Sequence, residues 1–340
     1  MGYFRTLTAQ CAQLEKLFQR EDRWLILINA DPDALASALA LQRIMQRKVK
    51  AVGIMHVNEV RRPDNLSMIR YLRIPTEFYD PEKAREYNKF ALVDSQPHHH
   101  PLFEGVRFSI VIDHHPLVPE KPVRADFVEI KTEYGANATI LVEYLHALRI
   151  KPGKRLATAL QYAIKADTNS FGRAFADVDV RAFRMLTPLA DQGLLRKVAR
   201  SEFRLDWLHY FSRAIEQIRF DKNGLHVFMG PVENPDVLVI LADFFMGVQE
   251  ISWTTVAGLF DQRIVCIFRG DGQSRGVRNL GQLAADTFGD VGSAGGHATM
   301  ARAEIPLAAI GDEDPEHFVW SRLCRKRSHG QRTTAPAVTG

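Results

Sequence analysis

The chain has 340 residues, of which 46% are hydrophobic and 25% charged, a composition that excludes a disordered or fibrous protein. This length exceeds one typical domain and predicts two. The formal net charge of +4 excludes the strongly basic surface that long nucleic acids or anionic membranes require.

The three cysteines, Cys11, Cys266 and Cys324, lie far apart in the sequence. This spacing excludes a disulfide framework and a cysteine-based structural zinc site. The first ten residues lack the pattern of a signal peptide, and the apolar runs are shorter than the ~20 residues of a membrane span. We therefore expect a cytoplasmic protein with no membrane segment.

The first half alternates short apolar runs with helical patterns. Strands are expected at 24–28, 50–57, 90–93 and 108–112, with helices at 34–46 and 65–72 and then at 135–149, 154–165 and 178–190. Strands that alternate with helices predict a parallel sheet covered by helices.

Residues 193–220 are expected to be largely helical, without a strand. After the Asn223-Gly224 turn, strands at 225–229, 254–260 and 264–268 and helices at 236–247 and 279–288 are expected. We therefore predict an α/β protein with a parallel-sheet domain (1–190), a helical linker (191–222) and a smaller α/β domain (223–312). Residues 325–340 are expected to form a disordered tail with a solvated basic cluster.

Carboxylates and imidazoles follow the predicted elements in four places: Asp31-Pro32-Asp33, Asp94, Asp113-His114-His115 and Asp167. Singly, most have an ordinary explanation, such as a turn with Asp33 as the helix N-cap. Adjacent Asp-His-His is rarely needed for packing, because each buried polar group needs a partner. Side chains of these types at one sheet edge suit Mn²⁺ or Mg²⁺, and two such ions ~3.5–4 Å apart serve phosphoester cleavage.

The order and spacing of these motifs resemble those of the DHH phosphoesterase superfamily. In addition, Gly295-Gly296-His297, preceded by Arg275-Gly276-Val277-Arg278, looks like the DHH-associated substrate-binding domain of the RecJ-like branch. That branch includes the oligoribonucleases that also dephosphorylate phosphoadenosine phosphate. The resemblance covers roughly residues 20 to 310.

The resemblance implies a site with one or two Mn²⁺ or Mg²⁺ ions. It makes Asp31 a ligand of the first metal and Asp33 a ligand of the second, with Asp94 as the bridge. His114 and Asp167 would complete the second site, with Asp113 in a supporting role, and His115 would contact phosphate or act as the acid. Backbone at Gly295 and Gly296 would approach the substrate, and His297, Arg275 and Arg278 would hold its terminal phosphate, although surface solvation also explains the two arginines.

One position departs from the family pattern. Family members usually have a metal-ligating histidine four residues before the first aspartate, where this chain has Leu27. Asn29 or the run His98-His99-His100 could substitute for it. Asn29 is also a common turn residue, and the three histidines could simply face solvent.

Two neighbouring segments leave alternatives open. An arginine of Arg61-Arg62 could reach the site or lie on a surface loop. The helix that starts near Gly135 could direct its amide groups at the metal site or have an ordinary cap.

The motifs together with the resemblance imply a phosphoesterase, an exonuclease-type hydrolase that cleaves short oligonucleotides or small nucleotides with metal-activated water. Candidate substrates are nanoRNA, a linear dinucleotide and phosphoadenosine phosphate, selected by a cleft between the domains, whereas the small net charge disfavours a long duplex. A nucleotide-binding sensor that lost activity with Leu27 and a pyrophosphatase or polyphosphatase are the alternatives. The oligomeric state stays open, a homodimer included.

Overall fold

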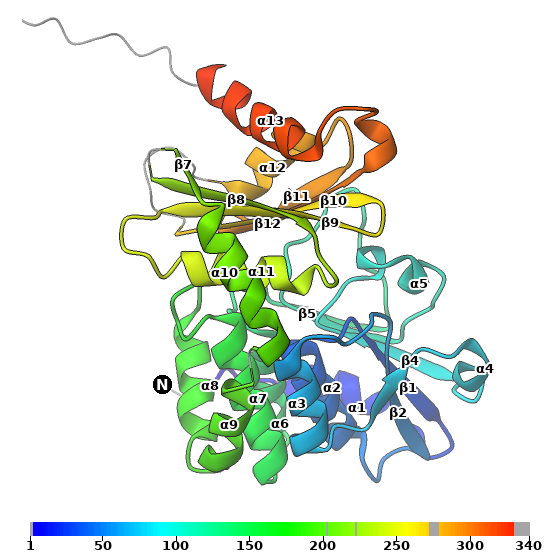
Figure 1. Ribbon diagram of the computed structural model, residues 1–340. Helices are drawn as coiled ribbons and strands as arrows, with labels where there is room; N and C mark the ends of the chain where they lie inside the picture. The colour runs from blue at the N-terminus through cyan, green and yellow to red at the C-terminus, as the bar shows by residue number, and fades with distance from the viewer. Residues whose placement is uncertain (1–2, 202, 222, 272–278, 330–340) are drawn as a thin grey trace, which may run out of the picture. The chain divides into compact units, whose positions relative to one another are not determined.

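The computed structural model describes residues 3–201, 203–221, 223–271 and 279–329 (Figure 1). The chain divides into two compact units, Met1–Phe203 and Arg204–Gly340. The division falls inside the predicted linker, so its helices are shared between the units. Every helix in the described ranges is too short or too polar to span a lipid bilayer.

The first unit is built on a parallel six-stranded sheet with the order β3-β2-β1-β4-β5-β6. The strands are β1 (Arg23–Ile28), β2 (Ala51–His56), β3 (Thr76–Phe78), β4 (Lys89–Val93), β5 (Ile110–Asp113) and β6 (Phe127–Ile130). The strand order reverses between β1 and β4. In open sheets of this kind, ligands bind beyond the carboxyl ends of the strands at that reversal.

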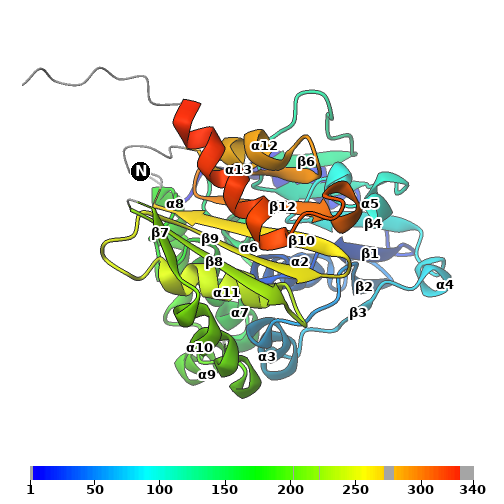
Figure 2. The same cartoon turned by 45° about the horizontal axis from the view of Figure 1, so that its top comes forward.

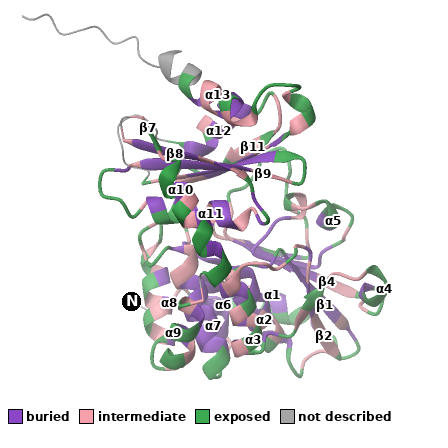
Figure 3. Ribbon diagram, viewed as in Figure 1, coloured by how far each residue is buried: buried purple, intermediate pink, exposed green. Residues whose placement is uncertain are grey.

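Helices cover both faces of this sheet, so its central strands are buried on both sides (Figure 3). On β1, Trp24 and Ile26 face a core formed with the larger helices, whereas Leu25 and Leu27 face a second cluster that includes Phe103. This two-sided burial explains why β1 has a continuous apolar sequence. The helices are α1 (Thr8–Lys16), α2 (Pro32–Met45), α3 (Pro63–Leu72), α4 (Pro81–Ala84), α5 (Pro101–Glu104), α6 (Asn137–Ala147), α7 (Lys154–Asp167), α8 (Asp177–Leu186) and α9 (Gln192–Ala199), with a 3₁₀ turn, η1 (Pro97–His99).

The second unit contains another six-stranded sheet, with the order β11-β12-β10-β9-β8-β7 (Figure 2). Its strands pair antiparallel except β8 with β9. One face packs against α10 and α11, and the other packs against α12 and α13. The elements are η2 (Leu205–Trp207), α10 (Leu208–Glu216), β7 (Arg219–Asp221), β8 (Gly224–Pro231), α11 (Asp236–Phe245), β9 (Trp253–Phe260), β10 (Arg263–Gly270), α12 (Leu280–Phe288), β11 (Ser293–Gly296), β12 (Met300–Pro306), η3 (Leu307–Ala309) and α13 (Pro315–His329).

The predicted α/β class and the parallel sheet of the first unit are confirmed. Two local expectations are wrong. Residues 193–220 were expected to contain no strand, but β7 begins at Arg219, where pairing with β8 overrides the helical pattern. The expected disordered tail is helical up to His329, because the apolar side chains of Phe318, Val319 and Leu323 anchor α13 to the core; residues 330–340 lie outside the described ranges.

Candidate metal centre

The first unit brings three separate carboxylates around one imidazole nitrogen. Nε2 of His114 lies 3.2 Å from Oδ2 of Asp167, 3.4 Å from Oδ1 of Asp94 and 3.9 Å from Oδ2 of Asp33. These four residues come from the start of α2, the residue after β4, the residue after β5 and the end of α7. We refer to Asp33, Asp94, His114 and Asp167 as the carboxylate–histidine cluster.

The second nitrogen of His114 fixes how the ring is oriented. Nδ1 lies 3.0 Å from the carbonyl oxygen of Tyr134, an acceptor, so Nδ1 carries the hydrogen. The lone pair of Nε2 then points at the carboxylates when the ring is neutral. A backbone partner of this kind is the usual support of a metal-ligating histidine.

The helix α6 begins at the cluster, and its first amides hold Asp33. The N–H groups of Asn137 and Ala138 donate to the two carboxylate oxygens at 2.6 and 2.7 Å. Burial and then the negative charge of Asp167 raise the pKa of Asp33 to about 7. Of the two alternatives for this helix, its amides therefore point at the cluster, where they bind and orient the Asp33 carboxylate.

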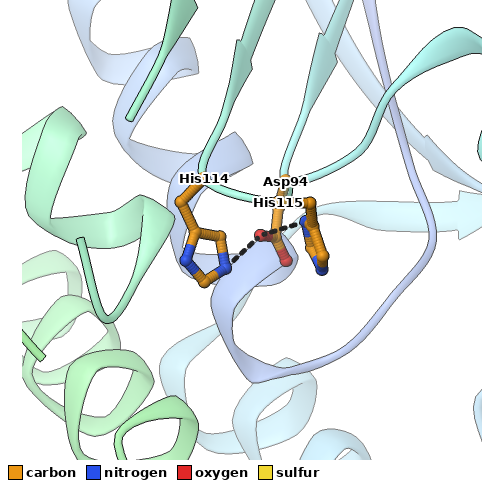
Figure 4. Close-up of side chains that lie close together, drawn as sticks. All are labelled: Asp94, His114 and His115. Carbon is orange, nitrogen blue, oxygen red and sulfur yellow. Dashed lines mark ion pairs between the residues drawn. The ribbon is translucent and has the colours of Figure 1, made fainter. Parts of the chain in front are cut away.

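Asp94 provides an unsatisfied acceptor at the centre of the cluster. Its Oδ1 atom is buried and has no hydrogen-bond partner among the described residues. Figure 4 shows this carboxylate between the rings of His114 and His115. Its φ of 57° is rare for a residue with a side chain, and such strain gathers at functional sites. Burial and the nearby charges of Asp33 and Asp31 raise its pKa well above the ordinary value.

Asp113 orients His115 and does not itself reach His114 Nε2. Nδ1 of His115 donates to Oδ1 of Asp113 at 2.8 Å, and Nε2 of Gln96 donates to the other oxygen at the same distance. Burial opposes ionisation of Asp113, but these hydrogen bonds and the charge on His115 lower its pKa to about 2. Asp113 therefore stays an anion and fixes the direction of the His115 ring.

The residues of the cluster fit a divalent metal ion. Burial would lower the pKa of His114, but the hydrogen bond and charge of Asp167 and the charge of Asp33 raise it to about 10. Without a metal the ring therefore carries the positive charge that offsets the carboxylates. Donor atoms of Asp33, His114 and Asp167 all lie within 4.8 Å of one another, as do those of Asp94, His114 and His115. The His115 nitrogen that faces Asp94 is Nδ1, at 3.9 Å, and this atom is already engaged by Asp113, so the four members of the cluster are the better ligand set.

The N-cap of α2 is Asp31, and the expectation that Asp33 caps this helix is wrong. The Asp31 carboxylate accepts a hydrogen bond from the amide of Ala34 at 2.8 Å. The Asp31 carboxyl also interacts electrostatically with Asp167 and Asp94. Among the described residues, however, Asp31 belongs to neither group of three metal donors.

The surroundings of Leu27, where the motif resemblance implies a histidine, are apolar. Leu27 is fully buried and pairs in register with Met55 and Leu92. Asn29 is exposed, and the loop next to it is held by Asn58, which accepts from the amide of Ala30 and donates to its carbonyl group. Among the described residues, none of His98, His99 and His100 belongs to a group of three metal donors.

The histidine run contacts the site through one member. The rings of His99 and His115 meet edge to face, with centroids 5.4 Å apart. Nδ1 of His99 also accepts from the amide of Gln96 at 3.2 Å. His98 and His100 are half-buried, so the run is not simply solvent-facing.

The two arginines after β2 pair with acids nearby in the sequence. Arg61 pairs with Glu59, and Arg62 makes two hydrogen bonds to buried Asp64, at 3.1 and 3.0 Å. These contacts favour the surface-loop alternative.

In the second unit, the Gly-Gly-His segment forms an edge strand and a turn. Gly296 has a φ of 145°, and an added Cβ would lie 2.3 Å from the carbonyl oxygen of Met300, so the turn itself requires glycine. Gly295 has open space around its Cβ position, and His297 is exposed. Arg275 and Arg278 lie outside the described residues.

Gln96 and Tyr134 are the residues that the motif reasoning missed. Gln96 is fully buried, and its Nε2 also lies 3.1 and 3.2 Å from the carbonyl oxygens of His115 and Pro116. It lies two residues after Asp94, and a glutamine there was a usable signal. Tyr134 acts through its backbone carbonyl group, so its side chain gave no signal in the sequence.

Comparison with known proteins shows the fold. No family model matches the sequence. The chain is 30% identical over 313 residues to an uncharacterized protein of Methanocaldococcus jannaschii, MJ1633, and this match covers 90% of the chain but only 63% of that relative.

Among solved structures, an exopolyphosphatase-related protein from Bacteroides fragilis has a TM-score of 0.74 at 14% identity, covering 94% of this chain and 97% of that one. A putative family II inorganic pyrophosphatase from Methanococcus jannaschii (TM-score 0.44, 16% identity, 90% and 99% coverage) and a pGpG-specific phosphodiesterase from Vibrio cholerae (0.47, 12%, 90% and 99%) are more distant. The chain therefore has the two-domain α/β fold of the Bacteroides protein.

Proposed function

We propose that this chain is a metal-dependent phosphoesterase of the DHH type that hydrolyses short single-stranded oligonucleotides or small nucleotides. The observation that carries the proposal is the convergence of Asp33, Asp94 and Asp167 on Nε2 of His114. Oxygen-rich sites with one imidazole suit Mn²⁺ or Mg²⁺. The motif order and the fold shared with a protein named for phosphate chemistry support the same class.

A divalent ion in the cluster would activate water and neutralise charge on the phosphate oxygens. Asp33, Asp94, His114 and Asp167 would hold it. The amides of α6 fix Asp33, and the carbonyl group of Tyr134 fixes the His114 ring.

His115 is suited to donate a proton to the leaving oxygen. Its side chain is 34% exposed, so a substrate can reach it. Burial lowers the pKa of His115, but the hydrogen bond and charge of Asp113 raise it above the ordinary value. The raised pKa favours the protonated ring, and with Nδ1 held by Asp113, Nε2 is the atom that would deliver the proton.

Two further features support the preference for a short substrate. The net charge of +4 favours a short substrate held by few cations. Gly295, Gly296 and His297, with Arg275 and Arg278, are proposed to bind its terminal phosphate, as the motif resemblance implies.

The experiment is a hydrolysis assay with Mn²⁺ on di- to pentanucleotides, phosphoadenosine phosphate, linear and cyclic dinucleotides, and pyrophosphate. Turnover of a short oligonucleotide or small nucleotide that falls at least ~100-fold in Asp94→Ala and His114→Ala supports the proposal. His146→Ala, a change on the exposed side of α6, is the matched control and should keep full activity. Turnover of pyrophosphate alone would contradict the substrate class.

A second candidate is a nucleotide-binding protein with little or no activity. Buried Leu27 favours it, because leucine cannot ligate a metal and only Asp31 and Asp94 remain for the first ion. Measurable nucleotide binding with no turnover of any substrate would support this candidate.

A further inference from the structure

The first unit has a hollow whose chemistry is very different from that of the cluster. It has a volume of about 600 Å³ and lies among the last turn of α2, the residues before and at the start of β2, the end of α3 and the start of α7. Figures 1 and 2 show α2, α3 and α7 side by side. The start of β2 is at the amino edge of the sheet, opposite the edge where the cluster lies.

The hollow is lined by cations without any acid. Five basic residues and no Asp or Glu contribute to its wall; the five are Arg43, Arg47, Lys50, Arg73 and Arg155. All five are exposed. In the described part of the chain, none of their side chains has an ion pair or hydrogen bond, whereas Arg23, Arg62 and Arg181 of the same unit pair with acids.

Part of this positive charge lies at the N-terminus of α7, where cations are unfavourable. The first turn of α7 contains Lys154 and Arg155 but no acid, and its N-cap, Gly153, offers no side-chain acceptor. The amides at a helix N-terminus favour anions and disfavour cations. Arg43 lies in the last turn of α2, where a cation is favourable, but Arg155 and Lys50 have no such explanation. An anion in the hollow would satisfy both the side chains and the amides of α7.

The floor of the hollow is apolar. Leu39, Val49 and Val52 are half-buried there, and Leu72 and Leu156 are buried. A volume of about 600 Å³ falls within the range of small-molecule pockets. Clustered cations with an apolar floor suit a ligand that combines several phosphates with a flat base.

We propose that this hollow is a binding site for a nucleoside polyphosphate, separate from the metal centre. Two helices connect the sites, because α2 runs from Asp33 in the cluster to Arg43 at the hollow and α7 runs from Arg155 at the hollow to Asp167 in the cluster. The proposal does not depend on the chain being a phosphoesterase.

The test is calorimetric titration with ATP in the presence of EDTA, which keeps metal out of the cluster. We expect one ATP per chain, with an affinity that falls as salt is added. The variant Arg47→Glu/Lys50→Glu/Arg155→Glu should weaken binding by roughly tenfold or more, because charge-assisted hydrogen bonds are lost. The neutral variant with glutamine at these three positions should also bind more weakly, and its unchanged melting temperature would exclude misfolding.

The matched control is Arg107→Glu/Arg124→Glu/Arg184→Glu, which reverses three cations that do not line the hollow. It should bind ATP as the wild type does, and so should Asp94→Ala. Equal weakening in both triple variants, or loss of binding in Asp94→Ala, would overturn the site. Tripolyphosphate should bind more weakly than ATP, and equal affinity would overturn the assignment of a nucleoside.

Discussion

Nε2 of Gln96 lies 2.8 Å from Oδ2 of Asp113 and links the loop after β4 to the end of β5. The same nitrogen contacts two backbone carbonyl groups of the following loop. Gln96 therefore holds the Asp113–His115 pair in place without reaching the substrate itself.

Gln96→Leu should lower kcat by roughly 10–100-fold, as is typical when the partner of a functional side chain is removed. KM should change much less, because Gln96 positions His115 and does not bind substrate. Steady-state kinetics on the best substrate measure the two constants separately. Gln19→Leu, at an exposed glutamine, is the control, and an equal loss in both variants would point to a general effect on stability.

Without metal, His114 should stabilise the fold in a pH-dependent way. Its pKa is raised from 6.5 to about 10 by Asp167 and Asp33 against the effect of burial. A raised pKa gives stability that is fully present below about pH 6.5 and is lost as the pH rises through about 10. In EDTA, the wild type should melt above His114→Gln near pH 6.5, and the difference should shrink toward pH 10. A difference that stays constant over this range contradicts the charge assignment.

Metal should have the opposite pH dependence. A bound ion requires Asp33 and His114 without their protons, and burial with the charge of Asp167 raises the pKa of Asp33 to about 7. The rise in melting temperature on adding Mn²⁺ should therefore be larger at pH 8.5 than at pH 6. Scanning calorimetry at both values measures it, and a larger rise at pH 6 would exclude these ligands.

Leu27→His tests whether the first metal site was lost with this residue. The imidazole should allow a second Mn²⁺ to bind, detected by calorimetry as a higher stoichiometry. Without metal, the variant should lose about 1–3 kcal/mol of stability, because a polar ring enters an apolar cluster.

Leu25→His is a matched control, since Leu25 lies on the same strand and in the same buried cluster. It should lose similar stability without gaining a metal. Unchanged stoichiometry in a folded Leu27→His would show that position 27 does not reach an ion.

The sequence was sufficient to predict the parts of the site that follow strands. Parallel strands end at one edge, so Asp94 and His114 could be placed together once β4 and β5 were recognised. Gln96 could not be predicted to hold Asp113, because that contact depends on how two loops pack. The four-residue strand β6 is too short to carry a clear pattern and is defined by its pairing with β5. In β12, by contrast, the alternation of buried Ala301, Ala303 and Ile305 with polar residues was a usable signal.

The most direct measurement is the stoichiometry of Mn²⁺ binding to the wild type and to His114→Ala, with His146→Ala as the control. His114 is the one residue whose Nε2 lies within 4 Å of Asp33, Asp94 and Asp167 in the described cluster. We predict that the wild type and His146→Ala bind at least one ion per chain and that His114→Ala loses it. Equal binding by all three proteins would contradict the account.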